Sequence, residues 1–177
     1  MKPIISILFF LLTLNSVSAQ DTNAIKKNIE ITTKKMAESF INRDWKEFVK
    51  YNLPSVVAAL GGEEAFIKAV GDVMKDLPDS SIKLFELGKP MQLVKTTDDW
   101  QTVIEQKTNI FFSEMMVKST TYLIGESLDG GITWTFIDSK GDLETVRVFK
   151  PDVSDKLILP ERKKEIDKEY KELKKDN

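Results

Sequence analysis

In the stretch Phe66-Ile-Lys-Ala-Val-Gly-Asp-Val-Met-Lys-Asp-Leu-Pro78-Asp-Ser-Ser-Ile82-Lys-Leu-Phe-Glu-Leu87, the spacing of the apolar residues changes from helical to strand-like. Before Pro78 the apolar residues recur every three or four positions and are predicted to share one helix face. Those residues are Phe66, Ile67, Val70, Val73, Met74 and Leu77. Pro78 is expected to end this helix, because proline cannot continue the helical hydrogen-bond ladder. The stretch therefore predicts a helical half of the chain followed by a β half.

Upstream of this stretch, the sequence carries further helix signals. Asp21, Thr22 and Asn23 are N-cap residue types, Pro54 suits a first helical position, and Gly61-Gly62 is a stop. The first predicted helix runs from Asp21-Thr22-Asn23 to about Arg43. The others run from Trp45 to Tyr51, from Pro54 to Leu60 and from Glu63 to Leu77.

Downstream, strand-like segments follow one another. Short strands are expected on either side of a Gly88-Lys89-Pro90 turn, and Asp129-Gly130-Gly131 predicts a tight hairpin. The other predicted strands are Trp100 to Phe112, Met115 to Gly125 and the alternating Ile132 to Asp138, and Leu143 to Phe149 is a last strand or a short helix. Helices followed by antiparallel strands indicate an α+β fold in one domain.

The N-terminus has the features of a secretory signal. Lys2 supplies a positive charge, residues 4–14 are almost wholly apolar, and Val17, Ser18 and Ala19 are small residues before a predicted cut. Residues 1–19 are therefore predicted to be a signal peptide, which makes the mature chain periplasmic or secreted. An uncleaved tether is the alternative, although the apolar run is shorter than the roughly 20 residues of a spanning helix. After cleavage we expect no membrane span.

Composition excludes several kinds of function. The chain contains no cysteine and no histidine, which excludes disulfides, thiolate chemistry, a Ser-His-Asp triad and His-ligated metals. Its net charge of −2 gives no electrostatic footprint for nucleic acid. Asp98-Asp99 is read as an isolated turn pair without the ligand spacing of a calcium loop. We therefore expect no metal, no cofactor and no nucleic-acid partner.

The C-terminal segment after Pro151 is rich in charges of both signs. Lysines and arginine between Arg162 and Lys175 alternate with acidic residues, a pattern typical of a solvated helix or tail. The predicted organisation is thus a signal peptide (1–19), a domain (20–150) and a C-terminal extension with a charged tail (151–177).

Three helices followed by a curved antiparallel sheet resemble the NTF2-like (SnoaL-like) superfamily. The segment from Tyr51 to Gly62, with its Tyr-Pro pair and Gly-Gly, is similar to uncharacterised exported proteins of Bacteroidetes-type bacteria. Trp134-Thr-Phe136-Ile-Asp138 and Leu157-Ile-Leu-Pro160-Glu161 are similar to segments of the same group. The resemblance covers about residues 21–162 and implies a cone-shaped sheet that commonly pairs face to face as a homodimer. It implies no activity.

A separate motif, Ser127-Leu-Asp129-Gly130-Gly131-Ile-Thr133-Trp134, matches the Asp-box that resembles the hairpins of sialidase-type propellers. A propeller repeats the box in each blade, whereas this chain contains it once. The motif is therefore interpreted as a stable hairpin, in which Asp129 accepts hydrogen bonds from turn amides and Trp134 packs beneath.

A cone-shaped sheet backed by helices leaves room for an apolar pocket, which is the default site for a small apolar ligand. Aromatic residues are the candidate lining, although aromatic residues at strand spacing are more often part of a filled core. The candidates are Trp45, Tyr51, Trp100, Phe112, Tyr122, Trp134 and Phe136. We predict a non-enzymatic domain that binds a small apolar or amphipathic ligand or a partner protein.

An isomerase- or dehydratase-type enzyme is the alternative function. Such an enzyme needs a carboxylate base that faces a tyrosine or a protonated acid in an apolar pocket. Glu105, Glu114 and Asp138 are the candidate bases and Tyr122 is the candidate oxyanion donor. No sequence spacing ties these four residues together, and surface pairing of Glu105 and Glu114 with lysines explains them equally well.

Overall fold

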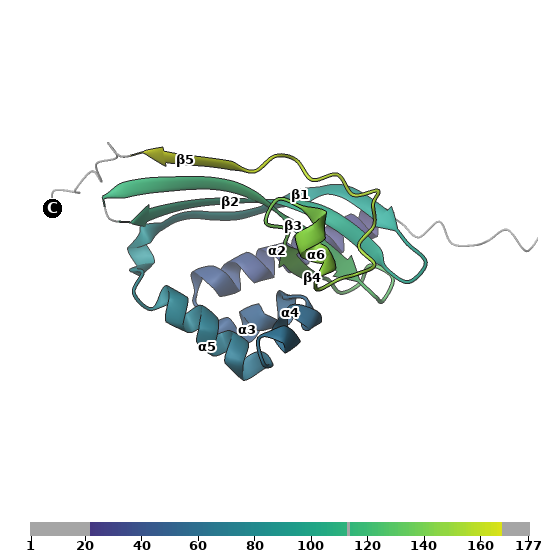
Figure 1. Ribbon diagram of the computed structural model, residues 1–177, viewed down its shortest axis with the longest axis horizontal. Coiled ribbons are helices and arrows are strands. Elements are labelled where there is room, and N and C mark those ends of the chain that lie inside the picture. Colours follow the sequence, from purple (N-terminus) through teal and green to yellow (C-terminus); the bar gives the residue numbers. More distant parts are fainter. Residues whose placement is uncertain (1–21, 113, 168–177) are drawn as a thin grey trace, which may run out of the picture.

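The computed structural model describes residues 22–112 and 114–167 (Figure 1). Within these ranges the chain is an α+β protein in which helices precede an antiparallel sheet, as the sequence predicts. The predicted signal peptide lies outside the described residues. The helices are α2 (Thr22–Ile41), α3 (Trp45–Phe48), η1 (Val49–Tyr51), α4 (Pro54–Ala59), α5 (Glu63–Met74), η2 (Asp79–Ser81) and α6 (Leu143–Arg147). The strands are β1 (Ile82–Lys95), β2 (Trp100–Phe112), β3 (Met115–Ser127), β4 (Thr135–Asp138) and β5 (Lys163–Asp167).

The helix ends follow local chemistry. The Asp44 side chain accepts a hydrogen bond from the Glu47 N–H at 3.0 Å and caps α3, while Pro54 occupies the first turn of α4. The predicted apolar face of α5 is only partly buried. Phe66 and Met74 are buried, but Val73 is 77% exposed, so its place on the buried face was predicted wrongly. At 3.6 residues per turn Val73 lies about 100° around the helix from the buried Met74, at the border of the apolar stripe, and therefore faces solvent.

The sheet has the order β1-β2-β3-β4, and β5 pairs with β3 (Figure 1). Strands β2 and β3 stay in unbroken antiparallel register from Trp100 opposite Ser127 to Phe112 opposite Met115. Both predicted strands are therefore confirmed. The helices α2 to α5 lie together on one side of this sheet in Figure 1.

The Gly88-Lys89-Pro90 segment is not the predicted turn. Residues 82–95 form one continuous strand, β1, whose register against β2 shifts between Leu87 and Pro90 and again between Pro90 and Gln92. A bulge places extra residues on one strand and bends it. Because β1 is an edge strand, Pro90 is tolerated there without interrupting the sheet.

The two faces of the sheet carry separate cores. Ile104 and Leu123 pack with buried residues of α2, α3 and α5, whereas their neighbours Val103 and Ile124 pack with α6 and the segment after it. Alternate residues of a strand point to opposite faces, so each central strand contributes to both cores. The helical core holds a group of aromatic rings from Phe40, Trp45, Phe48, Phe66 and Phe85, with Phe40 stacked on Phe85 at 4.2 Å between centroids.

The Asp-box forms the connection from β3 to β4, as expected. The Asp129 carboxylate accepts hydrogen bonds from the Ile132 N–H at 3.1 Å and the Thr133 N–H at 2.9 Å. Gly131 adopts a positive φ of 89°, and a Cβ there would lie 2.7 Å from Ile25 of α2. Strand β4 begins only at Thr135, so the prediction that strand alternation starts at Ile132 was wrong. Residues 132–134 are instead bound by the Asp129 turn.

The part of the chain from Leu143 onward agrees with the prediction at first and then differs from it. Leu143–Arg147 is a short helix, which was one of the two alternatives. Lys163–Asp167 pairs with β3 as the exposed strand β5, where a solvated helix or tail was predicted. Alternating charges suit a strand whose side chains face solvent equally well, so the charge pattern alone did not separate the two states.

Candidate functional site

A pocket of about 420 Å³ lies between α4, β4 and α6. We call it the α4/β4/α6 pocket. Its apolar walls come from α4, β4 and Phe149 after α6, and polar side chains join them. It is lined by Asn52, Val56, Ala59, Leu60, Phe136, Ile137, Asp138, Lys140, Thr145 and Phe149.

Backbone contacts fix the two sides of this pocket. The Leu53 N–H donates to the Phe136 carbonyl at 2.9 Å, and Asn52 forms a parallel bridge with Phe136, so the start of α4 is attached to β4. On the other side, the Asp142 carboxylate accepts a hydrogen bond from the Thr145 N–H at 2.6 Å and caps α6. This cap fixes the first turn of α6, from which Thr145 lines the pocket.

The chemistry of the pocket is that of an apolar surface with a few polar groups. Leu60 is half exposed, whereas Phe136 and Ile137 are buried where they border the pocket, and their side chains enter opposite cores. The Asp138 carboxylate accepts a hydrogen bond from the Lys140 N–H at 2.8 Å. Pockets of this size and composition bind small molecules by apolar contact, with the polar groups setting orientation. The arrangement therefore suits a ligand with an apolar body and one polar end.

The structure does not bring the seven candidate aromatic residues into one pocket. Phe136 lines the α4/β4/α6 pocket, while Tyr51 and Trp134 line a second pocket beside α2. Tyr122 is buried in the core on the opposite face of the sheet, and Phe112 is 59% exposed at the end of β2. The remaining two, Trp45 and Trp100, pack against the helical core.

The candidate enzyme residues are likewise dispersed, with one exception. Glu105 and Tyr122 are direct cross-strand partners on β2 and β3, a juxtaposition that no sequence spacing suggested. However, the Glu105 carboxylate forms an ion pair with Lys107 at 2.8 Å. Glu114 lies exposed between β2 and β3, and Asp138 lines the pocket on the other side of the sheet. These residues do not form one catalytic centre.

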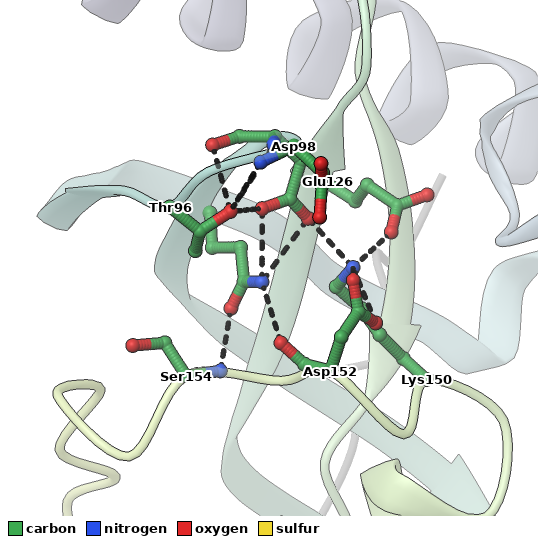
Figure 2. A network of polar contacts seen from close by, with 8 residues as sticks. Thr96, Asp98, Glu126, Lys150, Asp152 and Ser154 are labelled. Atoms are coloured by element: carbon green, nitrogen blue, oxygen red, sulfur yellow. Dashed lines mark hydrogen bonds and ion pairs between the residues drawn. The ribbon is translucent and has the colours of Figure 1, made fainter.

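A second group of polar residues is buried beside β2 and was not recognised in the sequence. The Lys150 ammonium lies 2.6 Å from the Asp99 carboxylate, 3.1 Å from that of Asp152, and also contacts Glu126 (Figure 2). Gln101 extends the group, because its amide donates to Asp99 at 3.0 Å and accepts from the Ser154 N–H at 2.8 Å. We call these residues the Lys150 cluster.

Burial makes this cluster unusual. The side chains of Asp99 and Lys150 are 0% and 3% exposed. The prediction that Asp98-Asp99 is an isolated turn pair is therefore wrong for Asp99. Its partner Lys150 lies far along the chain, after the end of α6, and no local sequence pattern connects the two residues.

The electrostatics of the Lys150 cluster favour fixed charges. Burial alone disfavours the Lys150 ammonium, but hydrogen bonds to Asp99, Glu126 and Asp152 outweigh it and raise the pKa of Lys150. Burial likewise works against the Asp99 carboxylate, yet hydrogen bonds from Lys150, Thr96 and Gln101 leave the pKa of Asp99 lowered. Neither group exchanges a proton near neutral pH. The cluster therefore anchors residues 150–154 to the sheet rather than performing acid-base chemistry.

Comparison with protein-family models, curated proteins and solved structures gives no match. The functional assignment therefore depends on the geometry alone. Within residues 22–112 and 114–167, no group of acidic side chains is placed to hold a metal ion. Over the same part of the chain, no helix combines the length and the apolar character needed to cross a membrane.

Proposed function

We propose that this chain is an exported, NTF2-like binding domain whose α4/β4/α6 pocket takes a small apolar or amphipathic ligand. The observation that carries the proposal is the pocket itself, about 420 Å³ in volume, with apolar walls and polar groups from Asn52, Asp138 and Thr145. Export is supported by the signal-like residues 1–19. The NTF2-like assignment is supported by N-terminal helices packed on one face of an antiparallel sheet.

Binding fits the site better than catalysis. An acid-base enzyme of the isomerase type needs a carboxylic acid whose pKa is raised by an apolar environment. Among residues 22–112 and 114–167, the carboxyl groups with a clear shift all have a lowered pKa, and they are Glu47, Asp72, Asp99, Asp129 and Asp142. The alternative enzyme would have to use Glu105 and Tyr122, where the nearby Lys107 already pairs with the carboxylate.

The pocket is tested with a variant that fills it. Ala59 lines the pocket from α4, so Ala59→Trp should place an indole in the ligand volume. The measurement is a titration of the full chain with the amphipathic fluorescent probe 1-anilinonaphthalene-8-sulfonate. We expect saturable binding at one site in the unmodified protein and at least a tenfold weaker affinity in Ala59→Trp.

Ser55→Trp is the matched control, because Ser55 is exposed on the same helix and does not line the pocket. This variant should bind the probe as the unmodified protein does. Equal affinity in all three proteins would contradict the proposal, since the probe would then bind elsewhere. Native mass spectrometry of protein purified from its own source should additionally reveal any ligand that co-purifies.

A further inference from the structure

The outer edge of β3 is covered by two different strands. Strand β4 pairs with its second half, from Leu123 to Glu126, and β5 pairs with its first half, from Met116 to Thr120 (Figure 1). Strand β4 continues into the α4/β4/α6 pocket and contributes the buried Phe136 and Ile137. Strand β5 contributes no residue to either core. Strands β4 and β5 therefore differ in how strongly the rest of the molecule holds them against β3.

Strand β5 is attached mainly by its backbone pairing. Four of its five residues are exposed, including Ile166 at 47%. The Lys118–Glu165 ion pair at 3.9 Å joins two exposed side chains, and such pairs contribute at most about 1 kcal/mol. The last fully buried apolar residue before β5 is Leu157, at 3% exposure. Detachment of β5 would thus open neither core.

The segment that leads to β5 has a defined fixed point. The Ile158 N–H and carbonyl both hydrogen-bond to the Gln92 side chain of β1, so the chain is held at this position. Residues 159–162 then run without regular structure to β5. Leu159 packs against the core that contains α6, and the Arg162 side chain donates to the Lys140 carbonyl at 2.8 Å. Turning of β5 about residues 160–162 therefore breaks the Arg162 contact while Ile158 and Leu159 stay in place.

The edge beneath β5 is suited to accept a strand. Met116 is 3% exposed under the present cover, and β3 keeps a regular register without bulges along its whole length. The opposite edge of the sheet, β1, carries Pro90, several lysines and register shifts, which are the usual features that prevent edge-to-edge pairing. The β3 edge between Met115 and Thr120 has neither a proline nor a bulge, so an uncovered β3 edge would pair with another strand.

We infer that the β3 edge is a strand-exchange site, at which β5 of a second copy replaces β5 of the same chain. The second copy carries the identical strand, so each register pair, such as Ser119 opposite Lys164, is reproduced between the two chains. Reciprocal exchange pairs the β3 edge of each chain with β5 of the other and gives a closed two-fold dimer. This dimer forms along a strand edge and differs from face-to-face pairing of sheets.

The test uses the absence of cysteine from the chain. Full-length Ser119→Cys protein is mixed with full-length Lys164→Cys protein of a different tag size, incubated, and treated with a short bismaleimide cross-linker. A cross-linked heterodimer requires β5 of one chain to pair with β3 of the other. We expect this product to increase with protein concentration and incubation time, at least fivefold above the control.

The control pairs Lys164→Cys with Ser55→Cys, an exposed site on α4 that is distant in the sheet pairing. This pair measures the cross-linking that results from random collision of two chains. The double variant Ser119→Cys/Lys164→Cys should cross-link within one chain, which verifies the register and blocks exchange. Heterodimer no more abundant than in the control, with the double variant closing normally, would overturn the inference. Absence of any cross-link in the double variant, within one chain or between two, would overturn it as well, because β5 would then not occupy the β3 edge.

Discussion

The Asp129 turn and the Lys150 cluster start from adjacent residues of β3 but lie on opposite faces of the sheet. Ser127 donates a hydrogen bond to the Asp129 carboxylate at 2.8 Å on the helical face, and Glu126 contacts the Lys150 ammonium on the other face. The partners of Asp129 all lie within four residues. Lys150 instead contacts Asp99 just before β2, Glu126 at the end of β3 and Asp152 in its own loop.

This difference decides what each cluster does for the fold. The Asp129 turn satisfies its own amides and shapes one connection, and its atoms remain close to water. The Lys150 cluster joins three segments that are far apart in sequence, and its central charges are removed from water. Loss of the Lys150 cluster should therefore affect the whole domain, whereas loss of the Asp129 turn should affect mainly its surroundings.

The largest effect is expected from Lys150→Met. This change leaves the carboxylates of Asp99 and Glu126 buried without their cation, and breaking a buried pair in this way costs about 3–5 kcal/mol. The free energy of unfolding, measured by urea denaturation at neutral pH, should fall by that amount. Lys107→Met is the matched control, because its ion pair with Glu105 is partly exposed and should cost at most about 1 kcal/mol.

If the two lysine variants lose the same stability, the Lys150 cluster is not a structural anchor. A second change sharpens the result. Adding Asp99→Asn to Lys150→Met removes one of the two uncompensated charges and should recover part of the lost stability. No recovery would indicate that the loss comes from packing of the lysine side chain rather than from charge.

The same contrast explains what the sequence could predict. The starts of the helices, the long strands β2 and β3 and the Asp129 turn all depend on residues near each other in sequence, and these were predicted correctly. The predicted ends were less accurate, since α5 ends at Met74 and not at Leu77. The Lys150 cluster depends on the register of β2 against β3, which brings Gln101 opposite Glu126. Single residues such as Asp99 carry no local sign of such a partner.

Other errors have a similar cause. Gly88-Lys89-Pro90 is compatible with a turn and with a bulged edge strand, and only the pairing with β2 selects the bulge. The exposed charges of 163–167 suit a helix, a tail or a strand, and only the available edge of β3 selects the strand. For the candidate site, aromatic residues could be named, but their distribution between two cores, two pockets and, for Phe112, the surface follows from the tertiary arrangement of helices and strands.

An intermediate effect is expected on the acid side of the stability profile. The pKa of Asp99 is lowered in the folded chain, so its contribution is present above the unfolded value of about 3.9 and is lost as the pH falls through the lower folded value. Asp99→Asn should therefore make the free energy of unfolding decrease less steeply below about pH 4. Urea denaturation at several pH values measures this slope.

Asp98→Asn is the control for the acid experiment, since Asp98 is the exposed neighbour of Asp99. It should leave the slope below pH 4 close to that of the unmodified protein. Identical slopes for the unmodified chain and Asp99→Asn would show that the Asp99 carboxylate gains nothing from its partners, and the Lys150 cluster would then contribute no electrostatic stability.

The smallest global effect is expected from Asp129→Ala. This change removes the acceptor for the Ile132 and Thr133 N–H groups, but the turn is exposed enough for water to replace part of it, so the cost should be about 1–2 kcal/mol. Hydrogen exchange at these two amides should accelerate, while the amide of Val146 in α6 keeps its protection. Asp129→Asn retains one acceptor oxygen and should restore much of the protection. Because the partners of Asp129 are all local, accelerated exchange that spreads to α6, or a loss as large as in Lys150→Met, would mean that the two clusters are coupled through β3 and that their opposite faces do not act independently.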